Sequence, residues 1–404
     1  MIPSDFGLRV RNSVTPRIFV AATRQDDGKT TTSLGLFAAL RKRFQNIGYI
    51  KPVGQRFVDV EGIKIDEDTV LINETYHVRT PLRAMSPIAV EQDFTKRYLT
   101  NANTLQLHRQ VMEAFDEASW EKDFIIIEGT GHAGVGSVFD CSNAVVAQLL
   151  RSKVIIVSQG GIGRPIDEIA LSLALFEKHG VEVIGAVFNK VLPDKIESLS
   201  EYAALGLERL GLPLLGIIPL HQELHQPTLN QVYLQLKGDF LSGGQYKRRR
   251  VSRFAIGAMS SRNVEAHFEP GTLIITPGDR EDIITAVIGD RDSGRAPIAG
   301  VVLTGGLLPS PDMLNAIRQS DIPFIAVDGD IYSIASAINE MTVKTEVGDR
   351  DKISVIQSLV QKHVQTDRIL DLIMNRGGEP ELPLEDENDA TPRSAALAPE
   401  PIGK

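Results

Sequence analysis

The stretch RIFVAATRQDDGKTTTSLGLFAALRKRF, residues 17–44, decides the fold of this chain. Residues 18–22 form an uninterrupted apolar run, which predicts a buried strand. A polar loop follows and ends in a Gly-Lys-Thr triplet at 28–30. Apolar residues then recur every three or four positions, which predicts a helix over 28–44: Leu34, Phe37, Leu40 and Phe44. A buried strand, a loop and an amphipathic helix in this order are the repeating unit of α/β sheets.

The same alternation of strands and helices continues to residue 220. Further strands are expected at 46–53, 124–130, 153–159, 182–191 and 212–220, and helices at 104–119, 140–151 and 165–180. Strands that are apolar on both faces and separated by helices indicate a parallel sheet covered by helices on both faces. We therefore predict an α/β domain over residues 17–225, preceded by a flexible lead-in over 1–16.

A second, smaller α/β domain is expected over residues 251–365, after a polar linker over 226–250. Its expected strands are 254–259, 271–279, 298–306 and 323–328, and its helices lie near 280–289, 311–319, 331–339 and 351–364. Residues 366–404 become acidic and rich in proline and alanine without apolar periodicity, which predicts a disordered tail.

The composition agrees with a globular protein of two to three domains at roughly 150 residues each, since 42% of the 404 residues are hydrophobic and 24% are charged. The net charge of −9 argues against a general nucleic-acid partner. The single cysteine, Cys141, cannot form an internal disulfide. No apolar run approaches the roughly 20 residues of a membrane helix, and the first ten residues lack the apolar segment of a secretory signal. We expect a cytoplasmic protein without a membrane partner.

The triplet Gly28, Lys29 and Thr30 is the strongest chemical signal. Backbone N–H groups at a helix N-terminus bind phosphate, a lysine reaches the β- and γ-phosphates, and a hydroxyl binds Mg²⁺. The expected nucleotide-binding residues are Thr23, Asp27, Gly28, Lys29, Thr30 and Thr31, with ATP and Mg²⁺ as cofactors. Thr23 stands where such loops usually have their first glycine, so a plain helix N-terminus remains the alternative. Asp26 and Asp27 would repel phosphate unless they face solvent or the metal.

Two charged residues follow apolar strands. Lys51 is expected at the carboxyl end of a strand, where ligands bind in open α/β sheets, and could stabilise charge on a transferred group as a catalytic residue together with Lys29. A surface lysine that caps the strand is the alternative. Glu128, at the end of the strand 124–130, is suited to hold Mg²⁺ directly or through water.

Five motifs in this order resemble the dethiobiotin synthetase family of P-loop proteins, in the version found at the N-terminus of long bacterial phosphate acetyltransferases. The motifs are Gly28-Lys29-Thr30, Lys51-Pro52-Val53, Glu128-Gly129-Thr130-Gly131, Phe188-Asn189-Lys190-Val191 and Leu215-Gly216-Ile217-Ile218-Pro219. The resemblance covers about residues 17–220 and implies a P-loop NTPase-type sheet.

The resemblance also implies roles for individual residues. It places a metal-binding aspartate at Asp68, with Asp66 as the less suitable choice, so that Thr30, Asp68 and Glu128 would hold the metal. It makes Asn189 the residue that recognises adenine, although Asn189 could equally cap its strand. A solvated acidic loop is the alternative for Asp66 and Asp68. Gln55 and Arg56 stand where the family binds its diamino-acid substrate, so biotin synthesis does not follow.

The region 251–365 resembles the DRTGG domain, which in those acetyltransferases lies between the P-loop and catalytic domains. The residues that carry the name are Asp279, Arg280, Thr304, Gly305 and Gly306. They form either a ligand site or a structural turn with an N-cap and a salt bridge. Because the sequence ends soon after residue 365, we expect neither an acetyltransferase catalytic domain nor direct acetyl transfer.

Two other patterns are given less weight. His221 and His225 are four residues apart, but Gln222 stands where a zinc-protease motif needs glutamate, so a solvated linker is preferred. The run Lys247–Arg250 has no interleaved aromatic residues, which favours a charged hinge over a nucleic-acid site.

The sequence as a whole predicts an Mg·ATP-binding P-loop protein that acts as a nucleotide-dependent regulator or slow ATPase. Its DRTGG domain would serve as a sensor or as the contact of a homodimer. The alternative is an ATP-dependent ligase or carboxylase that activates a carboxylate or carbamate. A binding module that has lost catalysis is a third hypothesis. Neither a substrate nor a protein partner can be named from the sequence.

Overall fold

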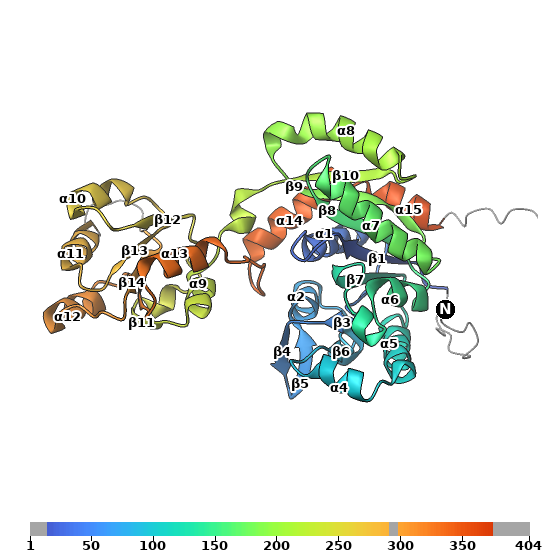
Figure 1. The fold of residues 1–404 in the computed structure, drawn as a ribbon, viewed down its shortest axis with the longest axis horizontal. Helices are drawn as coiled ribbons and strands as arrows, with labels where there is room; N and C mark the ends of the chain where they lie inside the picture. Colours follow the sequence, from blue (N-terminus) through green and yellow to red (C-terminus); the bar gives the residue numbers. More distant parts are fainter. Residues whose placement is uncertain (1–13, 291–297, 375–404) are drawn as a thin grey trace, which may run out of the picture.

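The computed structural model describes residues 14–290 and 298–374, which form two α/β bodies (Figure 1). The first body contains a six-stranded sheet in the order β10-β9-β8-β1-β7-β2, in which all neighbouring strands are parallel. Its strands are β1 (Arg17–Ala22), β2 (Ile47–Ile50), β7 (Phe124–His132), β8 (Lys153–Gln159), β9 (Val183–Val191) and β10 (Leu214–Pro219). The central strands are buried because both of their faces are apolar, as predicted.

Helices cover both faces of this first sheet, which confirms the predicted architecture. One face carries α1 (Lys29–Leu40), α2 (Glu67–Tyr76), α14 (Arg350–His363) and α15 (Thr366–Met374). The other face carries α5 (Thr104–Ala118), α6 (Asn143–Leu149), α7 (Arg164–Lys178) and α8 (Ile196–Glu208). After β1 and α1 the chain moves across the sheet to β2, and after β7 and α6 it moves the opposite way to β8, so the strand order reverses between the neighbouring strands β1 and β7. Ligands bind at such a switch point in open α/β sheets.

The segment between β2 and β7 forms a small subdomain beside the carboxyl edge of the sheet. Before α5, which covers the sheet, it contains β3 (Val53–Gly54), β4 (Phe57–Val60), β5 (Ile63–Asp66), α2, α3 (Leu82–Met85), β6 (Ile88–Ala89) and α4 (Phe94–Thr100). Strands β4 and β5 form an antiparallel hairpin that was not predicted. Its turn residues Glu61 and Gly62 both have positive φ, 53° and 82°, as two-residue hairpin turns commonly require.

The second body contains a five-stranded sheet in the order β11-β15-β14-β13-β12. Only β11 is antiparallel to its neighbour. The strands are β11 (Asp239–Ser242), β12 (Arg253–Ile256), β13 (Thr272–Pro277), β14 (Gly300–Thr304) and β15 (Phe324–Ala326). Helices α9 (Leu229–Leu236) and α13 (Ile331–Asn339) cover one face. The other face carries α10 (Ser261–Val264), α11 (Glu281–Asp290) and α12 (Pro311–Gln319). The second, smaller α/β domain is therefore present.

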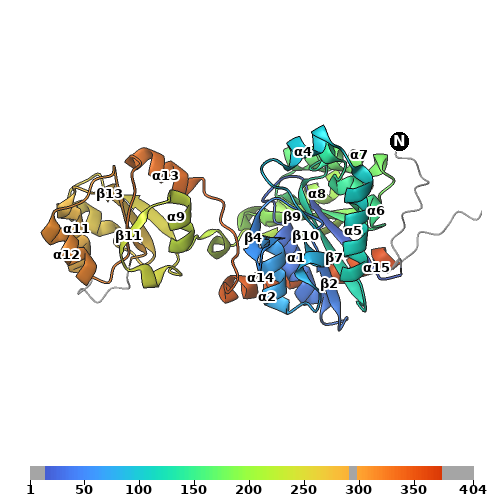
Figure 2. The same cartoon turned by 90° about the horizontal axis from the view of Figure 1, so that it is seen from below.

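The boundaries of the two bodies differ from the expected ones. Helix α9 and strand β11, expected in the linker 226–250, belong to the second body because Leu229 and Val232 pack into its core. Helix α14, expected in the second body, packs instead against α1 in the first (Figure 2). Helix α15, which begins the expected tail, lies against the same sheet through Ile369 and Leu370.

The remaining parts of the expected lead-in and tail, residues 1–13 and 375–404, lie outside the described residues. Short 3₁₀ turns connect several elements, at Ser137–Phe139, Pro193–Lys195, Gln222–His225, Gly244–Tyr246 and Glu265–His267. Over residues 14–290 and 298–374, no helix has both the length and the apolar character needed to cross a membrane.

Candidate nucleotide-binding site

The loop between β1 and α1 closes against strand β9. Gly28, directly before α1, has φ 107°, a left-handed conformation that favours glycine. A Cβ atom at this position would lie 1.9 Å from Asn189 Nδ2, so no other residue fits without rearrangement. Asn189 Nδ2 also donates a hydrogen bond to the carbonyl of Asp27 at 2.9 Å. The glycine expected to bind phosphate and the asparagine expected to bind adenine are therefore in contact.

Two residues expected to bind nucleotide lie behind the loop instead. Thr23 Oγ1 donates to Asp27 Oδ2 at 2.6 Å, and the backbone N–H of Arg24 donates to the same oxygen at 2.8 Å. Asp27 is fully buried, and neither Thr23 nor Asp27 lines the cavity in front of the loop. These side chains stabilise the loop from within, whereas the neighbouring Asp26 is exposed at the cavity rim. Asp27 therefore points away from where phosphate would bind.

A cavity of about 470 Å³ lies at the carboxyl edge of the first sheet, in front of this loop. Gly28, Lys29, Thr30 and Thr31 all line it. Lys29 Nζ donates to the carbonyls of Arg24 and Gly131 at 3.2 and 3.0 Å, and burial lowers the pKa of Lys29. Both acceptors are uncharged carbonyls, so this ammonium group keeps its charge available for phosphate.

A buried cluster of charges lies beside the loop, centred on Lys51. Its Nζ is 3.0 Å from Asp66 Oδ1 and 3.6 Å from Glu128 Oε1, and it also pairs with Asp68. Glu128 is fully buried in the middle of β7, and Thr30 Oγ1 donates to its Oε1 at 2.9 Å. Tyr49 OH donates to Oε2 of the same carboxylate at 3.1 Å. Lys51 is therefore enclosed in the site and is not a surface cap.

The pKa values follow from this enclosure. Burial would lower the pKa of Lys51, but the three surrounding carboxylates outweigh it and raise this pKa above its usual value. Burial raises the pKa of Glu128 and of Asp66. Burial also acts upward on Asp68, but Lys51 and Lys344 lower its pKa to about 2. Asp68 is thus held as a carboxylate at neutral pH.

The residues present fit a nucleotide with its metal. Thr30, Asp68 and Glu128 place a hydroxyl and two carboxylates at one end of the cavity, and Mg²⁺ takes one or two carboxylates together with phosphate oxygens. Asp66 also has a structural role, because it caps α2 by accepting a hydrogen bond from the N–H of Asp68 at 3.0 Å. Across the described ranges, no group of three or more His, Cys, Asp or Glu side chains is arranged to hold a metal ion by itself. Such an ion would depend on the phosphates for the rest of its ligands.

Sequence reasoning missed several residues that line this cavity. They are Gln25, His221, Leu224, His225, Ile356 and the segment 339–345 excluding Glu340. Gln55 and Arg56 also line it, as do Lys190 and Pro219 of the sequence motifs. His221 and His225, expected in a solvated linker, follow β10, whose carboxyl end lies at the same sheet edge. The sequence did contain this signal, because both histidines closely follow a predicted strand of the sheet.

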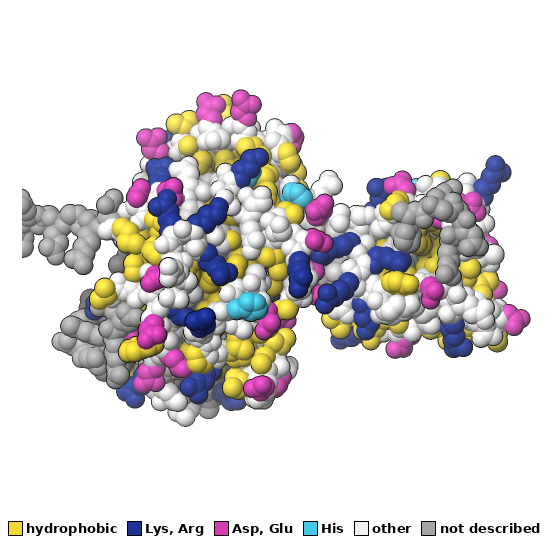
Figure 3. Space-filling model, turned by 180° about the vertical axis from the view of Figure 1, so that it is seen from behind, with side chains coloured by type: hydrophobic (Ala, Val, Ile, Leu, Met, Phe, Trp, Pro, Cys, Tyr) yellow, Lys and Arg dark blue, Asp and Glu magenta, His cyan; other side chains and the backbone are white. Residues whose placement is uncertain are grey.

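The charged run 247–250 lies mostly against the second body, and its last residue contacts the chain that leads back to the first. Arg250 pairs with Asp349 at 3.0 Å, and Arg249 donates to the carbonyl of Ile298 at 2.8 Å. Lys247 lies over the ring of Tyr233, 5.0 Å from its centroid. Figure 3 shows lysine and arginine side chains gathered where the bodies meet. Arg249 and Lys247 are thus fixed to the second body, and the interpretation of this run as a hinge stays a prediction.

In the second body, the residues of the DRTGG pattern meet at the carboxyl edge of the second sheet. The N–H of Gly278, next to Asp279, donates to the carbonyl of Thr304 at 3.2 Å. Gly305 and Gly306 have φ of 84° and 64°, so the turn after β14 uses their conformational freedom. Arg280 makes two hydrogen bonds to Asp282, at 2.8 and 2.9 Å, and one to the carbonyl of Met259 at 2.8 Å.

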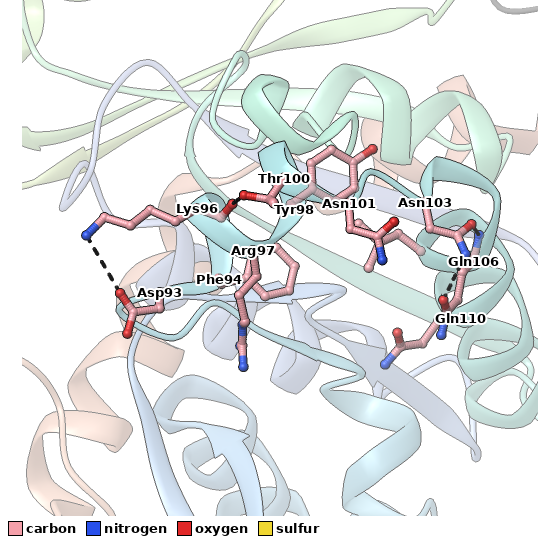
Figure 4. Close-up of a pocket in the computed structure, with 11 residues that line it drawn as sticks. Asp93, Phe94, Lys96, Arg97, Tyr98, Thr100, Asn101, Asn103, Gln106 and Gln110 are labelled. Atoms are coloured by element: carbon pink, nitrogen blue, oxygen red, sulfur yellow. Dashed lines mark hydrogen bonds and ion pairs between the residues drawn. The ribbon is translucent and has the colours of Figure 1, made fainter.

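Another hollow, of about 760 Å³, lies between α4 and α5 (Figure 4). None of the expected site residues lines it. Lys96 extends toward Asp93, which also lines the hollow, and their charged atoms are 3.8 Å apart. Both side chains are largely exposed, so this hollow lacks the buried charges of the first cavity.

A parallel sheet with a Gly-Lys-Thr loop between its first strand and first helix defines a P-loop type of nucleotide-binding protein. Residues 16–228 match the profile of the family described as AAA domain, and the chain belongs to that family. Residues 231–341 match the DRTGG domain. The resemblance predicted for the two domains is confirmed in this order.

The curated relatives include phosphate acetyltransferases. The enzyme of Pseudomonas putida is 29% identical over 362 residues, which cover 86% of this chain and 50% of the relative. That of Nitrosomonas europaea is 27% identical over 377 residues, covering 90% of this chain and 52% of the relative. The chain spans about half the length of these relatives and corresponds to their N-terminal region.

Solved structures give more distant likenesses. The septum site-determining protein MinD of Pyrococcus horikoshii, complexed with Mg-ADP, is 17% identical with a TM-score of 0.33, and the match covers 52% of this chain and 83% of that one. The CBS and DRTGG domains of a Clostridium perfringens pyrophosphatase, complexed with diadenosine tetraphosphate, are 18% identical with a TM-score of 0.25. That match covers 32% of this chain and 59% of the other.

Proposed function

We propose that this chain binds Mg·ATP at the P-loop edge of its first body and acts as a nucleotide-dependent regulator. One observation carries the proposal: Lys29, Thr30, Lys51, Asp68 and Glu128 all line a single cavity at the switch point of the sheet. Within the site, Lys29 would bind phosphate oxygens, and Thr30, Asp68 and Glu128 would hold the metal. The metal would supply charge neutralisation at the phosphates. Asn189 would contact the base.

Lysine at position 29 gives the direct test. Lys29→Ala removes the cation nearest the loop without removing a core side chain, so ATP affinity should fall at least a hundredfold while the circular dichroism spectrum stays unchanged. Isothermal titration of the full chain with ATP and Mg²⁺ measures this. Lys362→Ala, an exposed lysine on α14, is the matched control and should bind like wild type. Equal affinity in Lys29→Ala and wild type would contradict the proposal.

An ATP-dependent ligase is the second candidate, because Gln55 and Arg56 line the same cavity beyond the phosphate loop. A guanidinium there is suited to bind a substrate carboxylate. The two functions differ in phosphate release. A regulator should release phosphate slowly and at the same rate with or without added carboxylic or amino acids, whereas a ligase should be stimulated at least tenfold by its substrate.

A cytoplasmic homodimer completes the proposal, with the DRTGG domain as sensor or dimer contact. Light scattering of the full chain with and without ATP measures the oligomeric state. A monomer under both conditions would remove the dimer from the proposal and leave nucleotide binding in place.

A further inference from the structure

The chain leaves the second body after α13 and returns to the first through residues 340–349, here called the return segment (Figure 1). Five of its residues, Met341–Thr345, line the nucleotide cavity of the first body. The AAA match ends at residue 228 and the DRTGG match at 341, so most of the return segment lies in neither family. The cavity therefore has one wall that the AAA domain does not supply.

Lys344 is the cation of this wall. Its Nζ lies 3.0 Å from Glu67 Oε2, at the first residue of α2. Glu67 stands between Asp66 and Asp68, the two carboxylates of α2's N-terminus that pair with Lys51. Lys344 is thus at the end of the cavity where the metal and the terminal phosphates would bind, and its charge helps to lower the pKa of Asp68.

The backbone of Lys344 is anchored to the second body. Gln231 Nε2 donates to its carbonyl at 2.8 Å, and the same Gln231 side chain caps α9 together with Thr228. Further along the return segment, Asp349 pairs with Arg250 at 3.0 Å. The position of Lys344 therefore depends on how the second body lies against the first.

The present partner of Lys344 is weakly held. The Lys344 and Glu67 side chains are 29% and 42% exposed, and ion pairs with this exposure contribute little to stability. A nucleotide phosphate carries more charge than a single carboxylate, and it would meet Lys344 in a cavity where Lys29, bonded to backbone carbonyls, also favours anions. When Lys344 exchanges Glu67 for phosphate, the protein therefore loses little stability and Lys344 gains a charge-assisted hydrogen bond.

We propose that Lys344 is a nucleotide-binding residue, which leaves Glu67 and binds the phosphate end of the bound nucleotide. This inference rests on the proposed function of the cavity. It makes the site composite: the first body supplies the P-loop, and the second body supplies a cation through the return segment. By linkage, any effector that moves the second body changes ATP affinity, and ATP changes the affinity for that effector by the same factor.

The test compares four full-length proteins in titrations with ATP and AMP in the presence of Mg²⁺. Lys344→Gln should weaken ATP binding about tenfold, the lower end for a hydrogen bond between charged groups, and should weaken AMP binding less. Glu67→Gln breaks the same ion pair but leaves Lys344 free, so it should bind ATP as tightly as wild type or more tightly. Lys362→Gln should match wild type.

The outcomes separate this inference from the function beneath it. If wild type binds ATP and Lys29→Ala does not, while Lys344→Gln binds like wild type, the function stands and the role of Lys344 is overturned. If Glu67→Gln loses as much ATP affinity as Lys344→Gln, the ion pair only stabilises the arrangement of the two bodies. Lys344 then does not bind phosphate, and the inference fails. If wild type binds no nucleotide, the proposed function itself fails.

Discussion

The two bodies of this molecule are both built on sheets with parallel strands, yet their carboxyl edges hold charge in different ways. At the first edge, Lys51, Asp66 and Glu128 are at most 6% exposed and belong to different elements of the chain. At the second edge, Arg280 bonds to Asp282, two residues further on, and both side chains are partly exposed.

The difference in burial indicates which of the two edges is suited to bind a ligand. Removing an ion from water costs several kcal/mol, and a buried ion pair often recovers no more than that, so such clusters do little for stability. Ion pairs near the surface cost and contribute little. Buried, mutually perturbed charges in a cavity are characteristic of functional sites. The first edge therefore has the features of a ligand site, and the contacts of Arg280 are those of a structural turn.

The largest expected effect concerns the helix beneath the first edge. Val360 of α14 is fully buried, and a Cβ added to Gly35 of α1 would lie 2.2 Å from it. Val360→Asp would place a carboxylate in this apolar contact and should destabilise the first body by about 4 kcal/mol. Hydrogen exchange measured by peptide should show faster exchange in α1 and β1.

The matched control for this change is Gln361→Asp, at the exposed neighbouring position of α14. It should leave exchange in both bodies unchanged. Faster exchange in β13 and β14 of Val360→Asp, with α1 still protected, would show that α14 belongs to the second body, as the sequence suggested.

Sequence patterns predicted the sheets better than the partners of the outer helices. Continuous apolar runs such as 124–127 identify buried strands because both faces of the strand must be covered. The stripe of Ile353, Ile356 and Val360 identifies a helix with one buried face, but a stripe does not specify which sheet will cover it. Helix α14 follows the second body in the chain, and its return to the first could not be read locally.

The next expected effect compares two buried lysines. Lys51 has three carboxylates around it, whereas Lys352 donates to the carbonyl of Gln226 at 2.8 Å. Burial and the nearby Arg250 lower the pKa of Lys352 from 10.5 to about 8, although Asp349 and Glu346 act in the opposite direction. Between these pH values the unfolded chain binds more protons, so this residue makes stability rise with pH.

Urea denaturation at pH 8 and pH 10.5 measures this titration. The stability of wild type relative to Lys352→Met should increase by up to about 3 kcal/mol between the two pH values. Lys51 acts in the opposite direction, because its raised pKa keeps it charged in the folded state while the unfolded chain begins to lose this proton near pH 10.5. Its contribution is the same in wild type and in Lys352→Met, so it cancels in the difference between them. Lys362→Met is the control on the same helix. A constant difference between wild type and Lys352→Met would contradict the lowered pKa.

A smaller effect tests the metal side of the first edge. Glu128→Gln keeps the shape of the side chain but removes the charge. An amide NH2 replaces one of the two oxygens that accept from Thr30 and Tyr49, so one of these hydroxyls must turn to accept a hydrogen bond. We expect ATP affinity to fall about tenfold in Mg²⁺ and to change little without it. Glu281→Gln makes the same substitution at the second edge, where Glu281 accepts from the N–H of Ser310 at 2.6 Å, and should change neither affinity. An equal loss with and without Mg²⁺ would remove Glu128 from the metal site.

The site itself was predictable to the extent that strand ends could be located. Lys29 and Lys51 follow identifiable strands and Glu128 lies in one, so their meeting near one edge follows from a parallel sheet. Lys344 could not be found in this way, because it enters the cavity from a segment that follows a different sheet. The placing of Thr23 and Asp27 behind the loop also depends on side-chain directions that spacing does not give.

The smallest expected effect is at Arg280. A substitution there also tests whether the second edge binds a ligand or forms only a structural turn. Arg280→Ala removes the bonds to Asp282 and to the Met259 carbonyl, and since the side chain is 29% exposed, the loss of stability should be below about 1 kcal/mol. ATP affinity of the full chain should not change.

Arg318→Ala, at an exposed position of α12, controls for loss of positive charge on the second body. The informative readout is a titration of wild type, Arg280→Ala and Arg318→Ala with AMP, in the presence of saturating ATP to fill the first edge. If a second binding event is present in wild type and is lost only in Arg280→Ala, Arg280 is a ligand-binding residue, and the local pairing with Asp282 is a resting state that the ligand replaces.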